Sequence, residues 1–212
     1  MAKPMLKMSV EREVAESDFG AGGEIILDTA YFYGALVVEG DLHCASLEEL
    51  RALIASSVRG DEHLNAGHSA NEGAQLALLV RGSLRIDAFL HVGGFTSADP
   101  NDAKAVSQFC FCLGVDGHLR APGLSIGNYS HVNISGDIDV PFVRIGGSDG
   151  AMLHCGGTAR VGYFVHDQEQ WPIRFETAPV ECKTYEIKDT EGRNLPALVE
   201  AIARGESPLK GE

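Results

Sequence analysis

One alternating pattern of apolar and polar residues recurs five times along the chain. Each copy has an apolar residue at every second position on either side of a central glycine, and the copies are LVVEGDLHC from Leu36, LLVRGSLRI from Leu78, LGVDGHLRA from Leu113, VNISGDIDV from Val132 and LHCGGTARV from Leu153. A period of two places these apolar side chains on one face of an extended chain. The pattern therefore predicts short β-strands.

The polar residues of each copy have the opposite parity and are expected to face solvent. The central glycines are Gly40, Gly82, Gly117, Gly136 and Gly157. They have inward parity, so we expect corners of the chain where a side chain would collide with the core, or where the backbone needs an unusual φ.

The spacing of the glycines indicates a repeat of about 20 residues, which is typical of solenoids. Successive glycines are 42, 35, 19 and 21 residues apart. The first two intervals are close to twice the last two, so we expect one weaker unit inside each. Gly60 marks the candidate in the first interval, whereas residues 99–104 of the second read as an insertion loop.

Shorter apolar stretches follow the repeated units and predict a further strand in each turn of the repeat. They begin at Phe89, Gly123, Phe142 and Tyr163. The expected fold is mainly β: a single-stranded parallel β-helix in which Val38, Val80, Val115 and Ile134 stack in one row. A β-sandwich or barrel built from hairpins is the alternative, because it also consists of short alternating strands.

Two helices are expected at the ends of this repeat. SLEELRALIASS begins with a capping box formed by Ser46 and Glu49 and belongs beside the first coils. A second helix, over 194–205, closes the C-terminal end. We therefore expect one domain over 1–212, with an N-terminal cap over 1–30, coils over 31–166, and a C-terminal cap and tail over 167–212.

The composition narrows the class of protein. The chain has 17 basic and 30 acidic residues, a net charge of −13, which disfavours nucleic acid and membrane partners and favours a basic one. Neither a signal peptide nor an apolar run of about 20 residues is present, so we expect a cytoplasmic protein. The five cysteines contain no CxxC pair and are expected to be reduced core thiols.

Catalytic and metal-binding signals are weak, and we expect neither an enzyme nor a metal or cofactor. Only His63 and His68 are close together, and no cysteine accompanies them. Cys110 and Cys112 lie in an apolar stretch that favours core packing. The acidic pairs Glu39/Asp41 and Asp137/Asp139 would place two carboxylates about 7 Å apart on a strand face, as in some polysaccharide-cleaving enzymes.

The motifs VVEGDL, VRGSL, VDGHL and ISGDI, with the closing LPALVEAIARGESPL, resemble a group of poorly characterised bacterial proteins with repeated V-x-G-D-L elements. The resemblance covers residues 33–207. It implies a β-helix with a C-terminal helix and, because such proteins accompany polymorphic toxin and type VI secretion loci, an immunity role. The chain is also similar to bactofilins, but its spacing is less regular and it has a helix and a C-terminal cap.

These observations together predict an immunity protein that binds a cognate toxin or effector, a basic one if the acids make the contact. The acids expected to bind this partner are Glu39, Asp41, Asp116, Asp137 and Asp139. A bactofilin-like scaffold and a β-helical carbohydrate-active enzyme are the alternatives, and homodimerisation is left open.

Overall fold

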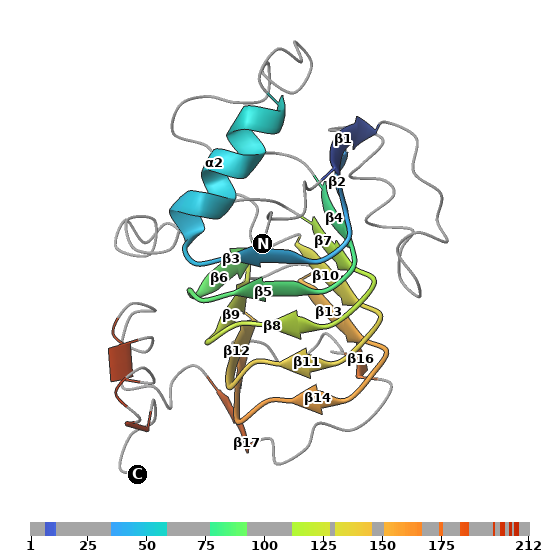
Figure 1. Ribbon diagram of the computed structural model, residues 1–212. Coiled ribbons are helices and arrows are strands. Elements are labelled where there is room, and N and C mark those ends of the chain that lie inside the picture. Colours follow the sequence, from blue (N-terminus) through green and yellow to red (C-terminus); the bar gives the residue numbers. More distant parts are fainter. Residues whose placement is uncertain are drawn as a thin grey trace.

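The described part of the chain consists mainly of β-strands, with a 12-residue helix beside them (Figure 1). The computed structural model describes residues 7–11, 35–58, 77–92, 112–127, 130–145, 151–166, 174–175 and 183–186, and the single residues 197, 200, 201, 204, 206 and 207. The statements below concern these residues. Gly60, His63, His68, Cys110, Cys182 and residues 99–104 lie outside them.

Three sheets make up the described structure. Sheet A has the order β1 (Lys7–Glu11), β2 (Ala35–Glu39), β4 (Ala77–Arg81), β7 (Cys112–Val115), β10 (His131–Ile134), β13 (Met152–Cys155) and β16 (Arg174–Phe175). Sheet B has the order β3 (Leu42–Cys44), β5 (Leu84–Ile86), β8 (Leu119–Arg120), β11 (Ile138–Asp139) and β14 (Ala159–Arg160). Sheet C has the order β6 (Leu90–Val92), β9 (Leu124–Ile126), β12 (Phe142–Ile145), β15 (Tyr163–His166) and β17 (Lys183–Glu186).

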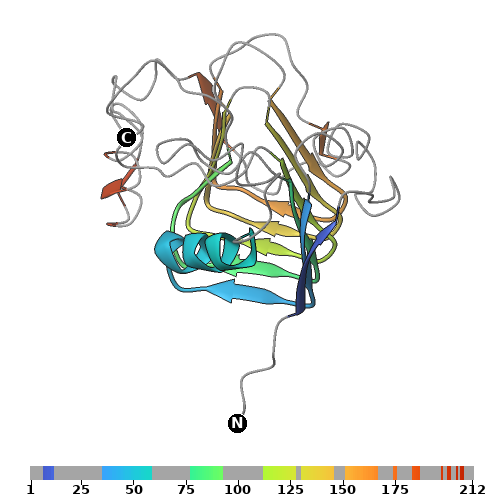
Figure 2. The ribbon, with the colours of Figure 1, turned by 90° about the horizontal axis from the view of Figure 1, so that it is seen from above.

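The chain visits the sheets in a fixed sequence. Units such as β4–β5–β6 and β7–β8–β9 place one strand in sheet A, one in sheet B and one in sheet C, and each strand pairs in parallel with its equivalent in the next unit. Figure 2 shows sheets A and C rising from opposite ends of sheet B. The apolar inner faces of the three sheets therefore share one interior.

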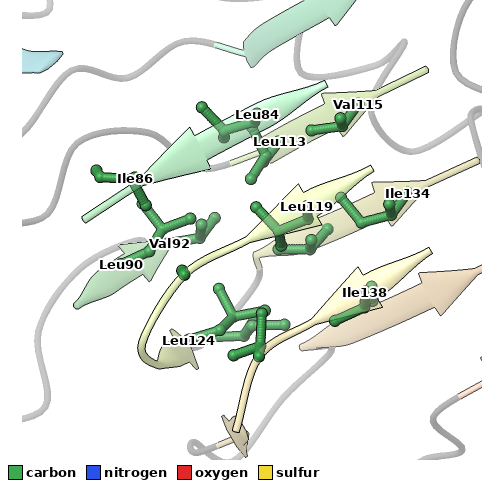
Figure 3. Close-up of a cluster of buried hydrophobic side chains, with 14 of the residues drawn as sticks. Leu84, Ile86, Leu90, Val92, Leu113, Val115, Leu119, Leu124, Ile134 and Ile138 are labelled. Atoms are coloured by element: carbon green, nitrogen blue, oxygen red, sulfur yellow. The ribbon is translucent and has the colours of Figure 1, made fainter. Parts of the chain in front are cut away.

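Equivalent apolar residues stack in columns through this interior. Val38, Val80, Val115 and Ile134 are register partners in adjacent parallel strands, so the predicted row is confirmed. Figure 3 shows the same stacking in the other sheets, where Leu84, Leu119 and Ile138 follow one another in sheet B. All of these side chains are buried. No strand buries its inner face alone, because the partners above and below it complete the cover.

The expectation of a weaker unit inside each of the first two glycine intervals is wrong. Strand β2 hydrogen-bonds directly to β4, pairing Leu36 with Leu78, and β4 pairs with β7, joining Leu78 to Leu113. A strand cannot lie between two directly paired strands. The extra residues of the first interval include helix α2 (Leu47–Val58).

The central glycines stack in a column because the backbones of successive units are in close contact. A side chain there would collide with the backbone of the neighbouring unit, and not with the core as the sequence predicts. A Cβ atom added to Gly136 would lie 2.5 Å from the carbonyl oxygen of Gly117, and one added to Gly157 would lie 2.6 Å from the carbonyl carbon of Gly136. Among the described glycines only Gly40 has a positive φ, 89°. Stacked backbone therefore excludes a side chain at this corner.

Helix α2 begins where the sequence predicts it. The N–H of Glu49 donates to Ser46 Oγ at 3.1 Å, as a capping box requires. The side chain of Glu49 accepts in return at 2.7 Å from the N–H of Ala45, the residue before Ser46. Leu50 and Ile54 are buried in the core cluster. The helix lies at the β2–β3 end of the stack and covers the interior there (Figure 1).

Both ends of sheet A differ from a simple repeat. Strand β1 pairs with β2 in antiparallel orientation and covers that edge. At the other end β16 pairs with β13, and β17 adds to sheet C beside β15, so the sheets extend past residue 166. Ala197, Glu200 and Ala201 are helical, in agreement with part of the predicted C-terminal helix.

The outer faces of the three sheets are not alike. Sheet B exposes its outer side chains, as the polar parity predicts. The outer faces of sheets A and C are buried at many positions: Val37 and Leu79 have no exposed surface, and neither does Ser125. Cys44 and Cys155 point into the core, whereas Cys112 is buried on the outer face of sheet A, and none of these three cysteines forms a disulfide.

Candidate partner-binding face

A ladder of hydrogen bonds runs along the corner between sheets A and B. It is formed by the residues that directly follow the central glycines, namely Asp41, Ser83, His118, Asp137 and Thr158. Each of the first four accepts, through its side chain, a hydrogen bond from the backbone N–H of the next member. The donor–acceptor distances are 2.7 Å to Asp41 Oδ1, 3.2 Å to Ser83 Oγ, 2.9 Å to His118 Nδ1 and 2.9 Å to Asp137 Oδ1.

The ladder fixes which nitrogen of His118 faces the next unit. Its Nδ1 atom accepts from the N–H of Asp137. Asp137 Oδ2 lies 3.9 Å from the same Nδ1. In the ladder His118 therefore stands between Ser83 and Asp137.

The outer column of sheet B places four charged side chains and one histidine on the exposed surface. Its members, one from each strand, are His43, Arg85, Arg120, Asp139 and Arg160. Each side chain is more than half exposed, with values from 51% for Asp139 to 67% for Arg120. Neighbouring members lie about 4.8 Å apart, the distance between paired strands.

Carboxylates hold this column in place through contacts between units. Asp87 accepts hydrogen bonds from His43 Nε2 and Arg85 Nε, both at 2.9 Å. These bonds, the one from His43 first, lower the pKa of Asp87. Arg120 Nε lies 3.5 Å from Asp139 Oδ2, so an arginine also pairs with an acid on the next strand. Such pairs at the surface contribute little stability each, but they orient the side chains.

All five predicted partner-binding acids make contacts inside the chain. Glu39 Oε1 lies 3.4 Å from Arg81 NH1, Asp139 pairs with Arg120, and Asp41 accepts from the N–H of Ser83. Asp137 accepts from Thr158 N–H and lies 3.4 Å from Arg160 NH1. The fifth, Asp116, is exposed and its backbone N–H donates to the carbonyl of Val80.

The structure brings these acids to one corner and the adjoining face, although not to one point. Asp137 and Asp139 belong to the same unit, whereas Asp41 lies three strands away from Asp137, a distance of about 14 Å at the usual strand spacing. We call this surface the charged face; it comprises Glu39, Asp41, His43, Arg85, Asp87, Asp116, His118, Arg120, Asp137, Asp139 and Arg160.

Sequence reasoning missed the arginines of the charged face as part of the site. The signal was present, because Arg85 and Arg120 share the polar parity of the acids and Arg160 occupies the same place in the fifth unit. The pairing of Arg120 with Asp139 and of Arg160 with Asp137 depends on the register of the strands. Residue spacing alone does not reveal that register.

The environment of Asp137 is unlike that of a general acid. The hydrogen bond from the backbone of Thr158, followed by contact with Arg160, lowers the pKa of Asp137. A carboxyl group that protonates a glycosidic oxygen needs a raised pKa. Its neighbour Asp139 is paired with Arg120. The lowered pKa of Asp137 is therefore the opposite of what a general acid requires.

Comparison with models of protein families, with curated proteins and with solved structures gives no match. The resemblance to V-x-G-D-L repeat proteins stays a prediction. Within the described ranges, no helix is long and apolar enough to span a membrane.

Proposed function

We propose that the chain is a single-stranded parallel β-helix that acts as an immunity protein, binding and neutralising a cognate toxin or effector through the charged face. The observation that carries this proposal is the exposed outer column of sheet B together with its hydrogen-bonded corner ladder. Charged side chains stand there on paired strands, and contacts between units hold them in place.

Preordered side chains favour recognition of a folded protein. Ordering a long side chain at an interface costs about 0.5–1.5 kcal/mol, so positions already fixed by Asp87 or by the ladder lose less on binding. The face carries both acids and arginines, which favours a partner with a matching pattern of charges over a merely charged polymer.

The overall charge indicates which partner would be attracted. A net charge of −13 draws a basic protein toward the molecule and slows the approach of nucleic acid. The carboxylate of Asp41 uses its Oδ1 in the ladder, and a toxin that offers arginine or lysine can contact its Oδ2. A rigid strand surface of this kind can cover an active site.

The decisive experiment is co-expression with the product of the neighbouring toxin gene, followed by size-exclusion chromatography of the mixture. The proposal expects restored growth and a stable complex. Growth arrest that persists, with two separate elution peaks, would remove the immunity role.

A shape-conserving variant tests whether the charged face makes the contact. Glu39→Gln with Asp41→Asn, Asp116→Asn, Asp137→Asn and Asp139→Asn keeps the acceptor oxygens but removes five charges. We expect association with the toxin to slow by about tenfold or more at low salt, in the range usual for electrostatic steering. The control is Glu48→Gln with Glu200→Gln, exposed acids outside the face, which should leave the rate unchanged.

The alternatives make different predictions. A bactofilin-like scaffold requires end-to-end stacking, and sedimentation at high concentration would then show species that grow with concentration. A carbohydrate-active enzyme would lose turnover when Asp137 and Asp139 are replaced by asparagine. Strand β1 already occupies the β2 edge of sheet A, which argues against parallel stacking of copies there.

A further inference from the structure

The outer face of sheet C carries two columns of side chains with different chemistry. One is aromatic: the ring of Phe89 lies over Gly123, where a Cβ would collide with it, and its centroid lies 6.1 Å from that of Phe142. The other column lies two residues further along each strand and contains His91, Ser125 and Arg144, which are register partners on β6, β9 and β12.

Two atoms of the polar column are buried without a hydrogen-bond partner in the part of the chain that the structure describes. They are His91 Nδ1 and Ser125 Oγ, and Ser125 as a residue has no exposed surface. Leaving such a group unsatisfied costs about 1–3 kcal/mol, so buried polar atoms are nearly always paired. Two unpaired atoms on adjacent strands indicate that a group outside the described residues completes them.

Arg144 supplies a charge at the same place. It is half-buried on the strand next to Ser125, and no ion pair of its guanidinium is found in the described part of the chain. Burial, followed by the proximity of Arg144, lowers the pKa of His91 to about 4, so the imidazole is neutral at pH 7. The row thus offers a guanidinium fork, a hydroxyl and a neutral imidazole.

This donor set matches one class of ligand. Arginine binds the oxygens of carboxylates and phosphates through paired N–H groups, and a hydroxyl and an imidazole N–H can donate to further oxygens of the same anion. In-register strands place the three side chains within about 10 Å of one another. We propose that His91, Ser125 and Arg144 form a binding site for a small oxyanion, either a carboxylate or a phosphate.

Another buried polar pair is, by contrast, satisfied in part within the chain. On the outer face of sheet A, Asn133 Oδ1 lies 2.7 Å from His154 Nδ1, so these two residues satisfy each other in part and only Asn133 Nδ2 remains unpaired. The sheet C row has no such internal bond. The oxyanion site is independent of the charged face and of the proposed partner.

The experiment is a titration of the full-length chain at pH 7 with sodium phosphate or sodium acetate, against sodium chloride at equal ionic strength, followed by NMR. We expect saturable shifts of the Ser125 amide and of the His91 ring signals with one of the two oxyanions and none with chloride. A response to phosphate alone, or to acetate alone, assigns the class of ligand.

Variants separate the site from general effects of added anions. Arg144→Gln should weaken binding at least about tenfold, and Ser125→Ala, which removes a single oxygen and leaves the core unchanged, should also weaken it. The matched control is Arg160→Gln, an exposed arginine of sheet B, which should bind as the wild type does.

A second readout uses proton linkage, since an anion that binds beside His91 must raise the pKa of that residue. Equal, non-saturating shifts with all three salts, or unchanged binding in Arg144→Gln and Ser125→Ala, would overturn the proposal. The unpaired atoms would then be hydrogen-bonded to water.

Discussion

A single methyl group at the glycine corner tests the contact between successive units. In Gly136→Ala the new Cβ would lie 2.5 Å from the carbonyl oxygen and 2.8 Å from the carbonyl carbon of Gly117, and 2.9 Å from His118 Nδ1. Ordinary contact begins at 3.4 Å, so the two units must separate by about 0.9 Å at this point.

The separation of the two units determines how much folding free energy Gly136→Ala loses. Overpacking of this kind costs about 1–3 kcal/mol. The bond from Gly136 N–H to the Gly117 carbonyl, now 2.9 Å, would lengthen beyond hydrogen-bonding distance and remove about 1 kcal/mol more. Alanine recovers about 0.4–1 kcal/mol by restricting the unfolded chain. The net loss expected is about 1–4 kcal/mol.

Urea denaturation measures this loss, and two other glycines are matched controls. In Gly162→Ala the Cβ meets only the Pro141 carbonyl group, at 3.1 Å to its oxygen, so we expect a loss below about 1 kcal/mol. In Gly40→Ala no atom lies within 4 Å, and only the positive φ costs about 1–2 kcal/mol. If Gly136→Ala were no more harmful than Gly162→Ala, the reasoning from stacked backbones would be refuted.

Three further perturbations follow from the described contacts. Burial lowers the pKa values of His91 and His131 to about 4, so the unfolded chain takes up protons that the folded chain does not as pH falls from about 6.5 to 4. Each histidine should then cost up to about 3 kcal/mol of stability, measured by urea midpoints at a series of pH values. His131→Gln should reduce the slope of stability against pH, and an unchanged slope would contradict the burial of His131. Asp137→Asn keeps an acceptor for the N–H of Thr158, whereas Asp137→Ala does not. The alanine variant should therefore have the lower urea midpoint, and equal midpoints would argue against the ladder. Leu119→Ala removes a fully buried side chain in the middle of sheet B and should cost about 2–5 kcal/mol in the same assay. A loss below about 1 kcal/mol would be inconsistent with the place of Leu119 in the core.

Much of the local structure could be predicted from the sequence because the signals are local. Strict alternation around Gly82 and Gly136 predicts strands whose inner residues are known from parity, and these residues are buried. Ser46 and Glu49 predict the start of α2 through a capping box, whose bonds span three and four residues.

Features that depend on the neighbouring unit could not be predicted. At Gly136 the sequence predicts that a side chain would collide with the core. The atoms that exclude a side chain belong instead to the backbone of Gly117, which is 19 residues earlier. The direct pairing of β2 with β4 is hidden because the sequence shows only that 42 residues separate Gly40 from Gly82.

The outer faces show the same limit. Polar parity predicts exposure well for sheet B but not for Ser125 or Asn133, which are buried on the outer faces of sheets C and A. Sequence did hold a clue in sheet A, where ALVVE and ALLVR are apolar at both parities. A strand covered on both faces has this composition.

Cysteine cross-linking tests the stacked parallel register most directly. Arg85 and Arg120 are exposed register partners on adjacent parallel strands, and the usual strand spacing of about 4.8 Å between them lies within the range that a disulfide spans. Arg85→Cys with Arg120→Cys should form a disulfide under mild oxidation, identified as a joined peptide by mass spectrometry. Arg85→Cys with Asp139→Cys, two strands apart, should not. A disulfide in the second pair and none in the first would contradict the stacked arrangement.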